Sequence, residues 1–347
     1  MEGALYQSKL DRVDPASVVR RTRPAGVHGG APLTRIETAA DAFGLVAPAL
    51  AACEARLARE VGSEVAVVAA ISSYLAESGG KRLRPLLTAL GAGAVGFEGP
   101  IEGLMCVGEM IHLGSLLHDD VVDEGDTRRG KPAAQRVYGN AAVILTGDYN
   151  LARAVLLAAT EGGQAAVTRL AQAVTAMAEG EVLQLQRAGN LDTSLDEYLE
   201  MIDKKSAALI AWCAMAGALA KGDADGAGML DRYGRAVGVA FQITDDVLDY
   251  GGPTGKPPGQ DLRERKLTLP LLYAMAHIPS LRGRLADPDA DIPALVTEIR
   301  ASGSLEEALS EARRRVAEAL ALLDGLPASP YRDGLAVLGT YLVERAS

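Results

Sequence analysis

The stretch Leu116–Asp123, LLHDDVVD, closes a long apolar run with aspartates at positions 119, 120 and 123. A second string of the same pattern, Asp245–Asp249 (DDVLD), closes another apolar run. In each string the first and last aspartates are four residues apart, so on a helix both carboxylates lie on one face. Unpaired carboxylates in apolar surroundings cost several kcal/mol, so water or positive charge must meet them. The pattern predicts two helices whose acidic ends bind a cation.

Magnesium is the cation that this chemistry favours. Mg²⁺ commonly takes one or two protein carboxylates and completes its shell with water and substrate phosphate. A single acidic string is more typical of a solvated helix face. Here Leu116, Leu117, Val247 and Leu248 flank the two strings with apolar side chains, which argues against a wet exterior. We therefore expect a phosphorylated substrate between two acidic helices.

The composition favours an all-α protein. Hydrophobic residues make up 48% of the 347 residues, but aromatic residues only 4%, and few stretches alternate with period two. Residues 1–35 are rich in Gly, Pro, Arg and Ser without helical period, which predicts a flexible N-terminal extension. Residues 36–347 show no composition shift and are predicted to form one all-α domain.

Charge and cysteine content exclude several classes of protein. A net charge of −10 and a pI near 5.1 argue against a nucleic-acid binder. Cys53, Cys106 and Cys213 form neither a disulfide pattern nor a CxxC site, which favours a reducing cytoplasm. The longest apolar run, Ala207–Ala220, is shorter than the roughly 20 residues that cross a bilayer, so we expect no transmembrane segment.

Apolar periodicity predicts the main helices. Ile101–Val122 is apolar on nearly every side, which is typical of a central helix. Further helical stretches are Asn140–Thr160, Leu170–Ala188, Asp196–Ala220 and Ala227–Tyr250. The basic strings Lys81–Pro85 and Thr127–Pro132 are predicted to be loops.

Basic residues in or near loops could approach the acidic helix ends and hold diphosphate oxygens. They are Lys81, Arg84, Arg128, Arg129, Lys205, Lys256 and Lys266. Any single cluster is more often a surface patch, but together with the carboxylates they indicate two phosphate subsites. His112 and Gln242 should share the acidic faces, two turns before Asp119 and three residues before Asp245. For each, a hydrogen-bonded core residue is the competing interpretation.

Several motifs resemble those of the trans-isoprenyl diphosphate synthases, the polyprenyl synthetase family. The resemblance runs from about Ile36 to the C-terminus. It rests on GGKRLRP (79–85), LLHDDVVDE (116–124), RRGKP (128–132), GEVLQ, FQITDDVLDY and DLRERKLTLP. The long-chain octaprenyl and solanesyl members are the closest type. The resemblance implies an all-α bundle of the isoprenoid synthase type around a central active-site cavity, and it implies a homodimer.

The resemblance also implies residue roles. Three Mg²⁺ ions, with Mn²⁺ as a possible replacement, would bind Asp119, Asp123 and Asp245, supported by Asp120 and Asp249. Isopentenyl diphosphate would bind Lys81, Arg84, His112 and Arg129. The allylic diphosphate would contact Arg128, Lys205 and Lys256, and Lys266 belongs to the same binding set. Ser206, where the family usually has Thr, and Gln242 complete the catalytic set.

Chain length in this family depends on residue size along the helix with the first acidic motif. Gly114 and Ser115 lie about one turn before Asp119, where short-product relatives often carry aromatic side chains, and Gly108 lies further up. These small residues predict a deep tunnel and a long-chain product, which Ile111 could close lower down. The alternatives are a farnesyl or geranylgeranyl diphosphate synthase, a terpene cyclase and a non-catalytic partner subunit. Lys81, Arg84 and Arg129 favour condensation over cyclisation, because a cyclase needs no second diphosphate pocket.

Overall fold

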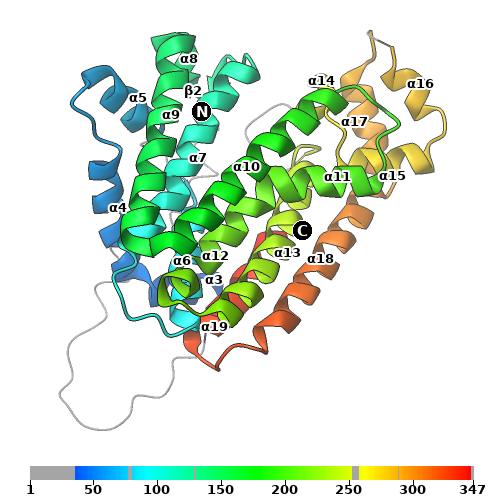
Figure 1. Cartoon of the computed structure of the whole chain (residues 1–347). Coiled ribbons are helices and arrows are strands. Elements are labelled where there is room, and N and C mark those ends of the chain that lie inside the picture. The colour runs from blue at the N-terminus through cyan, green and yellow to red at the C-terminus, as the bar shows by residue number, and fades with distance from the viewer. Residues whose placement is uncertain (1–35, 77–79, 129, 252–257, 288, 345–347) are drawn as a thin grey trace.

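The computed structural model describes residues 36–347 except 77–79, 129, 252–257, 288 and 345–347. The predicted extension 1–35 lies outside the described residues, and the assignment of 36–347 to one domain stays a prediction. The all-α prediction is confirmed, because helices dominate and the strands in the described ranges form one short hairpin (Figure 1).

The first half of the chain forms one group of helices and the hairpin. The helices are α3 (Ala39–Leu45), α4 (Ala47–Glu60), α5 (Ala66–Ala76), α6 (Leu83–Ala94), α7 (Glu102–Val122), α8 (Ala134–Tyr138) and α9 (Asn140–Leu157). The predicted loop 127–132 contains the antiparallel hairpin of β1 (Thr127–Arg128) and β2 (Lys131–Pro132), in which Thr127 pairs with Pro132.

The second half contains the longer helices and two π-helical turns. Its elements are η2 (Ala158–Gly162), α10 (Gly163–Arg187), α11 (Leu195–Ile202), η3 (Asp203–Ala207), α12 (Ala208–Lys221) and α13 (Ala224–Leu248). The chain then forms α14 (Gln260–Arg263), α15 (Leu269–His277), α16 (Leu281–Leu285), α17 (Ile292–Ala301), α18 (Ser304–Leu323) and α19 (Pro330–Glu344).

The helix bounds follow local sequence signals. Ser194 and Glu197 form a reciprocal capping box at the start of α11, and Gly222 ends α12 in the left-handed conformation. The predicted helix Ile101–Val122 is α7 almost to the residue. The predicted single helix Asp196–Ala220 is α11 and α12, joined through η3 at Asp203–Ala207. Periodicity alone does not signal this local widening of the helix.

Helix α12 lies at the centre of the core. Its residues from Ala208 to Ala218 are all buried, and the indole of Trp212 donates to the carbonyl of Ala166 at 3.0 Å. It packs against α13, α6 and α10. Gly91 of α6 lets the two backbones meet, since a Cβ at this position would lie 2.0 Å from the carbonyl oxygen of Ala214. The longest apolar run of the sequence is therefore a core helix.

Helices α9 and α10 follow each other through η2. The helical stretch Asn140–Arg187 is 48 residues long and apolar enough to cross a membrane by length and composition, and 39% of its most apolar window is buried. Core helices of soluble proteins pass the same test.

Both acidic helices end at the same end of the bundle. Helix α7 packs against α9, α4 and α6, and α13 packs against α12 and α18. The elements that follow their C-termini, α8 and α14, lie at the top of Figure 1 on its left and right sides. The two acidic strings thus close two buried helices that point the same way, which positions the candidate site between them.

Candidate active site

The end of α7 divides its three aspartates into different environments. Burial raises the pKa of Asp119 to about 6, Lys205 and Arg128 act against this shift, and Glu181 and Asp123 add to it. Asp123 is more exposed and caps the C-terminus of α7, donating from its backbone N–H to the carbonyl of Asp119 at 2.8 Å. Asp119 therefore lies among both acidic and basic side chains, and burial is the main reason that its pKa is raised.

Asp120 anchors the loop that follows α7. Its carboxylate is 3% exposed, forms an ion pair with the Arg128 guanidinium, and accepts a hydrogen bond from the backbone N–H of Ala134 at 3.2 Å. Both oxygens thus have protein partners. In this arrangement Asp120 holds the β1–β2 segment onto α7, and Arg128 lies beside the acidic motif as predicted.

Lys205 is presented by the π-helical turn η3. Its ammonium lies 2.6 Å from the Glu181 carboxylate and 3.2 Å from the side-chain oxygen of Gln184, both on α10. Gly180 makes this approach possible, because a Cβ there would lie 2.5 Å from the backbone nitrogen of Lys205. The motif GEVLQ thus holds Lys205 next to Asp119, a role that sequence reasoning left open.

A chain of hydrogen bonds connects the second motif to Ser206. The Ser206 hydroxyl donates to the Gln242 side-chain oxygen at 2.7 Å, and the Gln242 amide donates to Asp246 at 2.8 Å. The buried Tyr198 hydroxyl donates to the other oxygen of Asp246 at 2.6 Å. Burial raises the pKa of Asp246 to about 7. Ser206 and Gln242, two of the predicted catalytic residues, are therefore in contact, and Asp246 and Tyr198 lie behind them.

Lys266 links the first acidic motif to the end of α14. Its ammonium lies 3.9 Å from the Asp123 carboxylate and 2.6 Å from that of Glu264. The pKa of the nearby Asp261 carboxyl is raised well above its usual value by burial, then by Asp246 and Asp249, and Lys266 acts in the opposite direction. Lys266 thus lies between the end of α7 and the α14 segment, which Asp249 holds at the end of α13.

Asp249 has a structural contact that sequence reasoning missed. Its two oxygens accept hydrogen bonds from the backbone N–H groups of Gln260 at 3.2 Å and Asp261 at 3.0 Å. A carboxylate at these N–H groups satisfies donors that the start of α14 leaves open. Asp249 therefore holds α14 against the end of α13.

The remaining predicted ligands lie around α6 and α7. Arg84 lies in the first turn of α6, and no described residue accepts a hydrogen bond from its buried Nε. Lys81 and His112 are half-buried. The predicted ligands Arg129 and Lys256 lie outside the described residues. A buried guanidinium nitrogen without an acceptor suits an anion subsite at Arg84.

The predicted chain-length residues do not share one environment. Ser115 is half-buried, and its hydroxyl donates back to the carbonyl of His112 at 2.9 Å. Gly114 lies against α9, where a Cβ would be 3.1 Å from the carbonyl oxygen of Gly147. Ile111 is fully buried, and a Cβ at Gly108 would lie 2.5 Å from the sulfur of Cys213. Gly114 is thus constrained by helix packing, which leaves Ser115 as the better place to test tunnel length.

The acidic side chains fit magnesium, although they do not form a finished cage. The described part of the chain contains no group of three or more His, Cys, Asp or Glu residues arranged to hold a metal. Mg²⁺ needs only one or two carboxylates when water and phosphate supply the other ligands. Burial raises the pKa of Asp119 to about 6 although Lys205 and Arg128 act against the shift, so its carboxylate is poorly solvated and a bound cation would stabilise the charged form. The oxygen donors and this poorly solvated carboxylate both suit a hard divalent cation.

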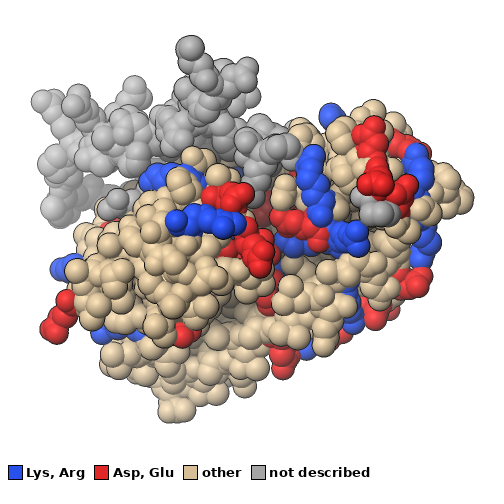
Figure 2. Space-filling model, turned by 90° about the horizontal axis from the view of Figure 1, so that it is seen from above, with Lys and Arg blue, Asp and Glu red and all other residues tan. Residues whose placement is uncertain are grey.

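The surface agrees with this placement. Seen from above, acidic and basic side chains gather near the middle of the face and over its right side, whereas the lower left is largely uncharged (Figure 2).

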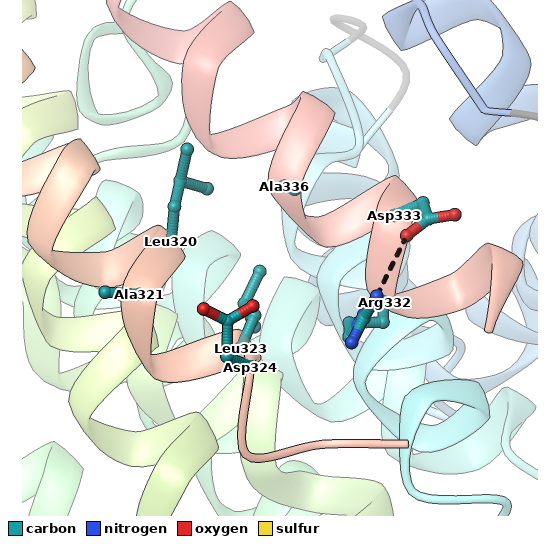
Figure 3. A pocket seen from close by; sticks show the side chains of 7 residues that line it. All are labelled: Leu320, Ala321, Leu323, Asp324, Arg332, Asp333 and Ala336. Atoms are coloured by element: carbon teal, nitrogen blue, oxygen red, sulfur yellow. Dashed lines mark ion pairs between the residues drawn. The ribbon is translucent and has the colours of Figure 1, made fainter. Parts of the chain in front are cut away.

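A separate hollow of about 320 Å³ lies between α18 and α19, beside an ion pair of Arg332 and Asp333 at 3.8 Å (Figure 3). The residues that line it include none of the predicted site residues.

Comparison with known proteins decides the family. The polyprenyl synthetase family model matches residues 65–288. The chain belongs to the polyprenyl synthetase family. This polyprenyl synthetase is 36% identical over 313 residues to octaprenyl diphosphate synthase of Escherichia coli (strain K12), covering 87% of this chain and 97% of that protein. It is 36% identical over 286 residues to nonaprenyl diphosphate synthase of Mycobacterium tuberculosis, covering 78% and 85%.

Solved structures give the same result. A polyprenyl synthase from Caulobacter crescentus CB15, complexed with calcium and isoprenyl diphosphate, has a TM-score of 0.84 and 38% identity over 89% of this chain and 98% of that one. A decaprenyl diphosphate synthase from Rhodobacter capsulatus has a TM-score of 0.83 and 38% identity over 89% and 99%. The resemblance read from the motifs is confirmed, and the polyprenyl synthetase is a transferase of prenyl groups with an all-α isoprenoid synthase fold.

We predict that Gly180→Ala impairs this polyprenyl synthetase by displacing Lys205. The added Cβ must push η3 away from α10, and a misplacement of about 1 Å can cost on the order of a hundredfold in rate. Prenyl transfer should fall at least about tenfold, while circular dichroism and thermal unfolding show a folded protein. Gly228→Ala is the control, because a Cβ at this position in α13 meets nothing within 4 Å. Full activity of Gly180→Ala would contradict the role of this close approach.

Proposed function

We propose that this protein condenses isopentenyl diphosphate head-to-tail with an allylic diphosphate and repeats the reaction to make a long-chain all-trans polyprenyl diphosphate. The observation that carries the proposal is that Lys205 lies beside Asp119 and Lys266 beside Asp123, next to the α14 segment that Asp249 of the second motif holds. The names of the relatives support the product class, since octaprenyl, nonaprenyl and decaprenyl diphosphate synthases are among them.

The allylic diphosphate would lie between the ends of α7 and α13. Lys205 and Arg128 supply positive charge on the side of Asp119, and Lys266 supplies it on the side of Asp123. Asp119, Asp123 and Asp245 would hold Mg²⁺, three ions in all by analogy with the family, and these ions supply charge neutralisation for the departing diphosphate. Lys256 would add a further contact.

Isopentenyl diphosphate would occupy a second subsite without metal. Lys81, Arg84, His112 and Arg129 would bind its diphosphate directly. Arg84 suits this role because its Nε is buried and meets no acceptor among the described residues. A diphosphate offers several acceptor oxygens to such a cluster, and Arg can bind two of them at once.

The chemistry then needs three things from the chain. Lys205 and Lys266 stabilise charge on the diphosphate as the allylic carbon–oxygen bond breaks and the diphosphate leaves with the electron pair. The Ser206 hydroxyl and the Gln242 carbonyl oxygen, 2.7 Å apart, offer uncharged dipoles that stabilise the allylic cation without reacting with it. The double bond of isopentenyl diphosphate attacks the cation, and the proton lost afterwards goes to the released diphosphate. Apolar walls exclude water from the cation.

We further propose that the protein forms a homodimer through α9 and α10. Apolar side chains are exposed along these helices, and the spacing of Leu145 and Leu156 places both on one face of α9, with 65% and 52% of their surface exposed. Val182 and Leu185 of α10 are 52% and 53% exposed. Exposed apolar side chains that share a helix face are typical of contact sites. A similar protein, from Geobacillus stearothermophilus, is named heptaprenyl diphosphate synthase component 2, so a heteromeric partner is the competing assembly.

We propose a cytoplasmic location.

We predict that Asp119→Asn and Asp245→Asn each reduce condensation by at least about a hundredfold, because each removes charge that would hold Mg²⁺. Incorporation of labelled isopentenyl diphosphate, measured across a magnesium titration and with an EDTA control, checks this. Asp225→Asn, at an exposed position in the first turn of α13, is the matched control. Near-normal turnover of either variant at low magnesium would refute the assigned metal role.

We predict that Ser115→Phe shortens the product while turnover with short allylic primers persists. The ring would project from the face of α7 that carries Asp119 and narrow the space for the growing chain. Mass spectrometry of products from a set of primers measures this. Gly114→Phe provides the contrast, since a side chain there would collide with α9 and should reduce stability instead. An unchanged product distribution for Ser115→Phe would remove the ruler argument.

We predict that Leu145→Glu combined with Leu156→Glu converts the dimer to a monomer. Two charges on the exposed apolar face of α9 would have to be buried on association, which is costly without partners. Size-exclusion chromatography with light scattering gives the mass of each variant. Val65→Glu, at an exposed apolar position between α4 and α5, is the control. A wild-type monomer, or an unaffected dimer in the double variant, would show that this face is not the interface.

A further inference from the structure

Arg82 stands out in the basic string before α6. It precedes the first residue of the helix and adopts the left-handed conformation, with φ 49° and ψ 36°. Residues other than glycine adopt this conformation at a cost in free energy and need compensating contacts. The carbonyl of Arg82 accepts the first helical hydrogen bond of α6 from Leu86 at 3.1 Å. Contacts of the Arg82 side chain must therefore offset the cost of this backbone conformation.

The Arg82 guanidinium contacts three other helices. It forms a two-point ion pair with Glu54 of α4, in which one N–O distance is 3.1 Å. It donates to Glu109 of α7 at 3.0 Å and to the carbonyl of Ala76, the last residue of α5, at 3.4 Å. Every nitrogen of the guanidinium is engaged. Two carboxylates already neutralise Arg82, so it is poorly suited to bind a phosphate itself.

Glu109 connects this contact to the candidate site. Its carboxylate is only 4% exposed, and Arg82 is the partner that the structure gives it. Glu109 precedes His112 by three residues on α7, so the two side chains are neighbours on one helix face. On the other side of the ion pair, Lys81 and Arg84 flank Arg82 in the chain. The Arg82–Glu109 pair therefore lies between the two segments that carry the proposed ligands of isopentenyl diphosphate.

We propose that Arg82 is a positioning residue for the isopentenyl diphosphate subsite, whose fork between Glu54 and Glu109 sets the place of Lys81 and Arg84 relative to His112. The inference rests on the proposed function. A diphosphate held by direct hydrogen bonds requires donors on two segments to meet it together, and a small displacement of one segment loses those bonds. Arg82 fixes the two segments before the substrate arrives.

The fork geometry distinguishes this role from that of any cation. Arg offers planar, bidentate donors, whereas Lys offers a single ammonium and cannot contact Glu54, Glu109 and Ala76 in the same arrangement. Arg82→Lys keeps the charge and a residue with the same backbone preference, so it tests the fork alone. Glu109→Gln keeps the shape of the side chain on α7 and removes only its charge.

The experiment measures steady-state kinetics of the full-length protein with isopentenyl diphosphate and an allylic primer varied in turn. For Arg82→Lys and Glu109→Gln, the KM for isopentenyl diphosphate should rise roughly tenfold, the loss expected from one weakened hydrogen bond to a charged group. The KM for the primer and kcat should change less than about threefold. Calorimetric titration with isopentenyl diphosphate alone should show the same weakening.

Arg56→Lys is the matched control. Arg56 lies on α4, contacts Glu60 at 3.3 Å and forks onto Glu161 of η2, with a side-chain exposure of 26% against 20% for Arg82. Arg56→Lys should lower the midpoint of thermal unfolding about as much as Arg82→Lys does. It should leave the KM for isopentenyl diphosphate unchanged. This separates positioning from a general loss of an interhelical ion pair.

The outcomes are distinguishable. An unchanged KM for isopentenyl diphosphate in both variants, or equal rises in both substrate KM values, overturns the positioning role while the proposed function stands. If Arg82→Lys does not fold, Glu109→Gln decides by the same criterion, since it changes no volume. Wild-type protein that condenses no primer refutes the proposed function itself, and calorimetric titration then still tests the Arg82 subsite on its own.

Discussion

The structure depends on bringing several negatively charged carboxylates together at the ends of two buried helices. Asp119 and Asp123 close α7, and Asp245 and its neighbours close α13, with Glu181, Glu264 and Asp261 close by. Such crowding costs free energy in a protein without ligands, because like charges raise one another's pKa values and burial weakens solvation. Lys205, Lys266 and Arg128 offset part of this cost. The remaining deficit of positive charge is what a divalent cation and a diphosphate would together satisfy.

The second constraint is the position and direction of the Lys205 side chain in the π-helical turn η3. The π-helical turn η3 adds one residue to the helical repeat between α11 and α12, so Lys205 and Ser206 point in other directions than in a regular α-helix. Lys205 contacts α10, and Ser206 contacts Gln242 of α13. Gly180 on the facing helix supplies the space. Behind this turn, Tyr198 and Asp246 fix the Gln242 amide, so the residues that face the substrate have their orientation set by a buried polar chain.

Much of this arrangement was accessible from the sequence, and the exceptions have a common cause. The bounds of α7 and the all-α class follow from apolar periodicity, and the acidic strings follow from spacing within one helix, whereas the contact of Ser206 with Gln242 joins two elements and is seen only in the structure. The roles of Glu181 and Gln184 in the motif GEVLQ do not follow from the sequence, because their partner Lys205 comes from another element, a π-helical turn that periodicity does not reveal. The sequence predicts Asp120 and Asp249 as supporting metal ligands; in the structure one oxygen of Asp120 and both oxygens of Asp249 accept backbone N–H groups of segments that follow each motif. A spacing rule within a motif cannot show which member turns back to hold the next loop.

The two proposed subsites differ in how they obtain their rigidity, and α7 explains why both can work side by side. Near its C-terminus, charge neutralisation would come from ions that enter with the substrate, so the carboxylates need only share a face. One to three turns earlier, the ligands for the second diphosphate come from different segments and have no ion to organise them. There Glu109 is buried on α7 and paired with Arg82, whose left-handed backbone conformation is offset by that ion pair. The helix thus carries an adaptable site at its end and a preorganised one along its side, which is what repeated condensation requires: the allylic product must shift and rebind, while each new isopentenyl diphosphate must be placed the same way every time.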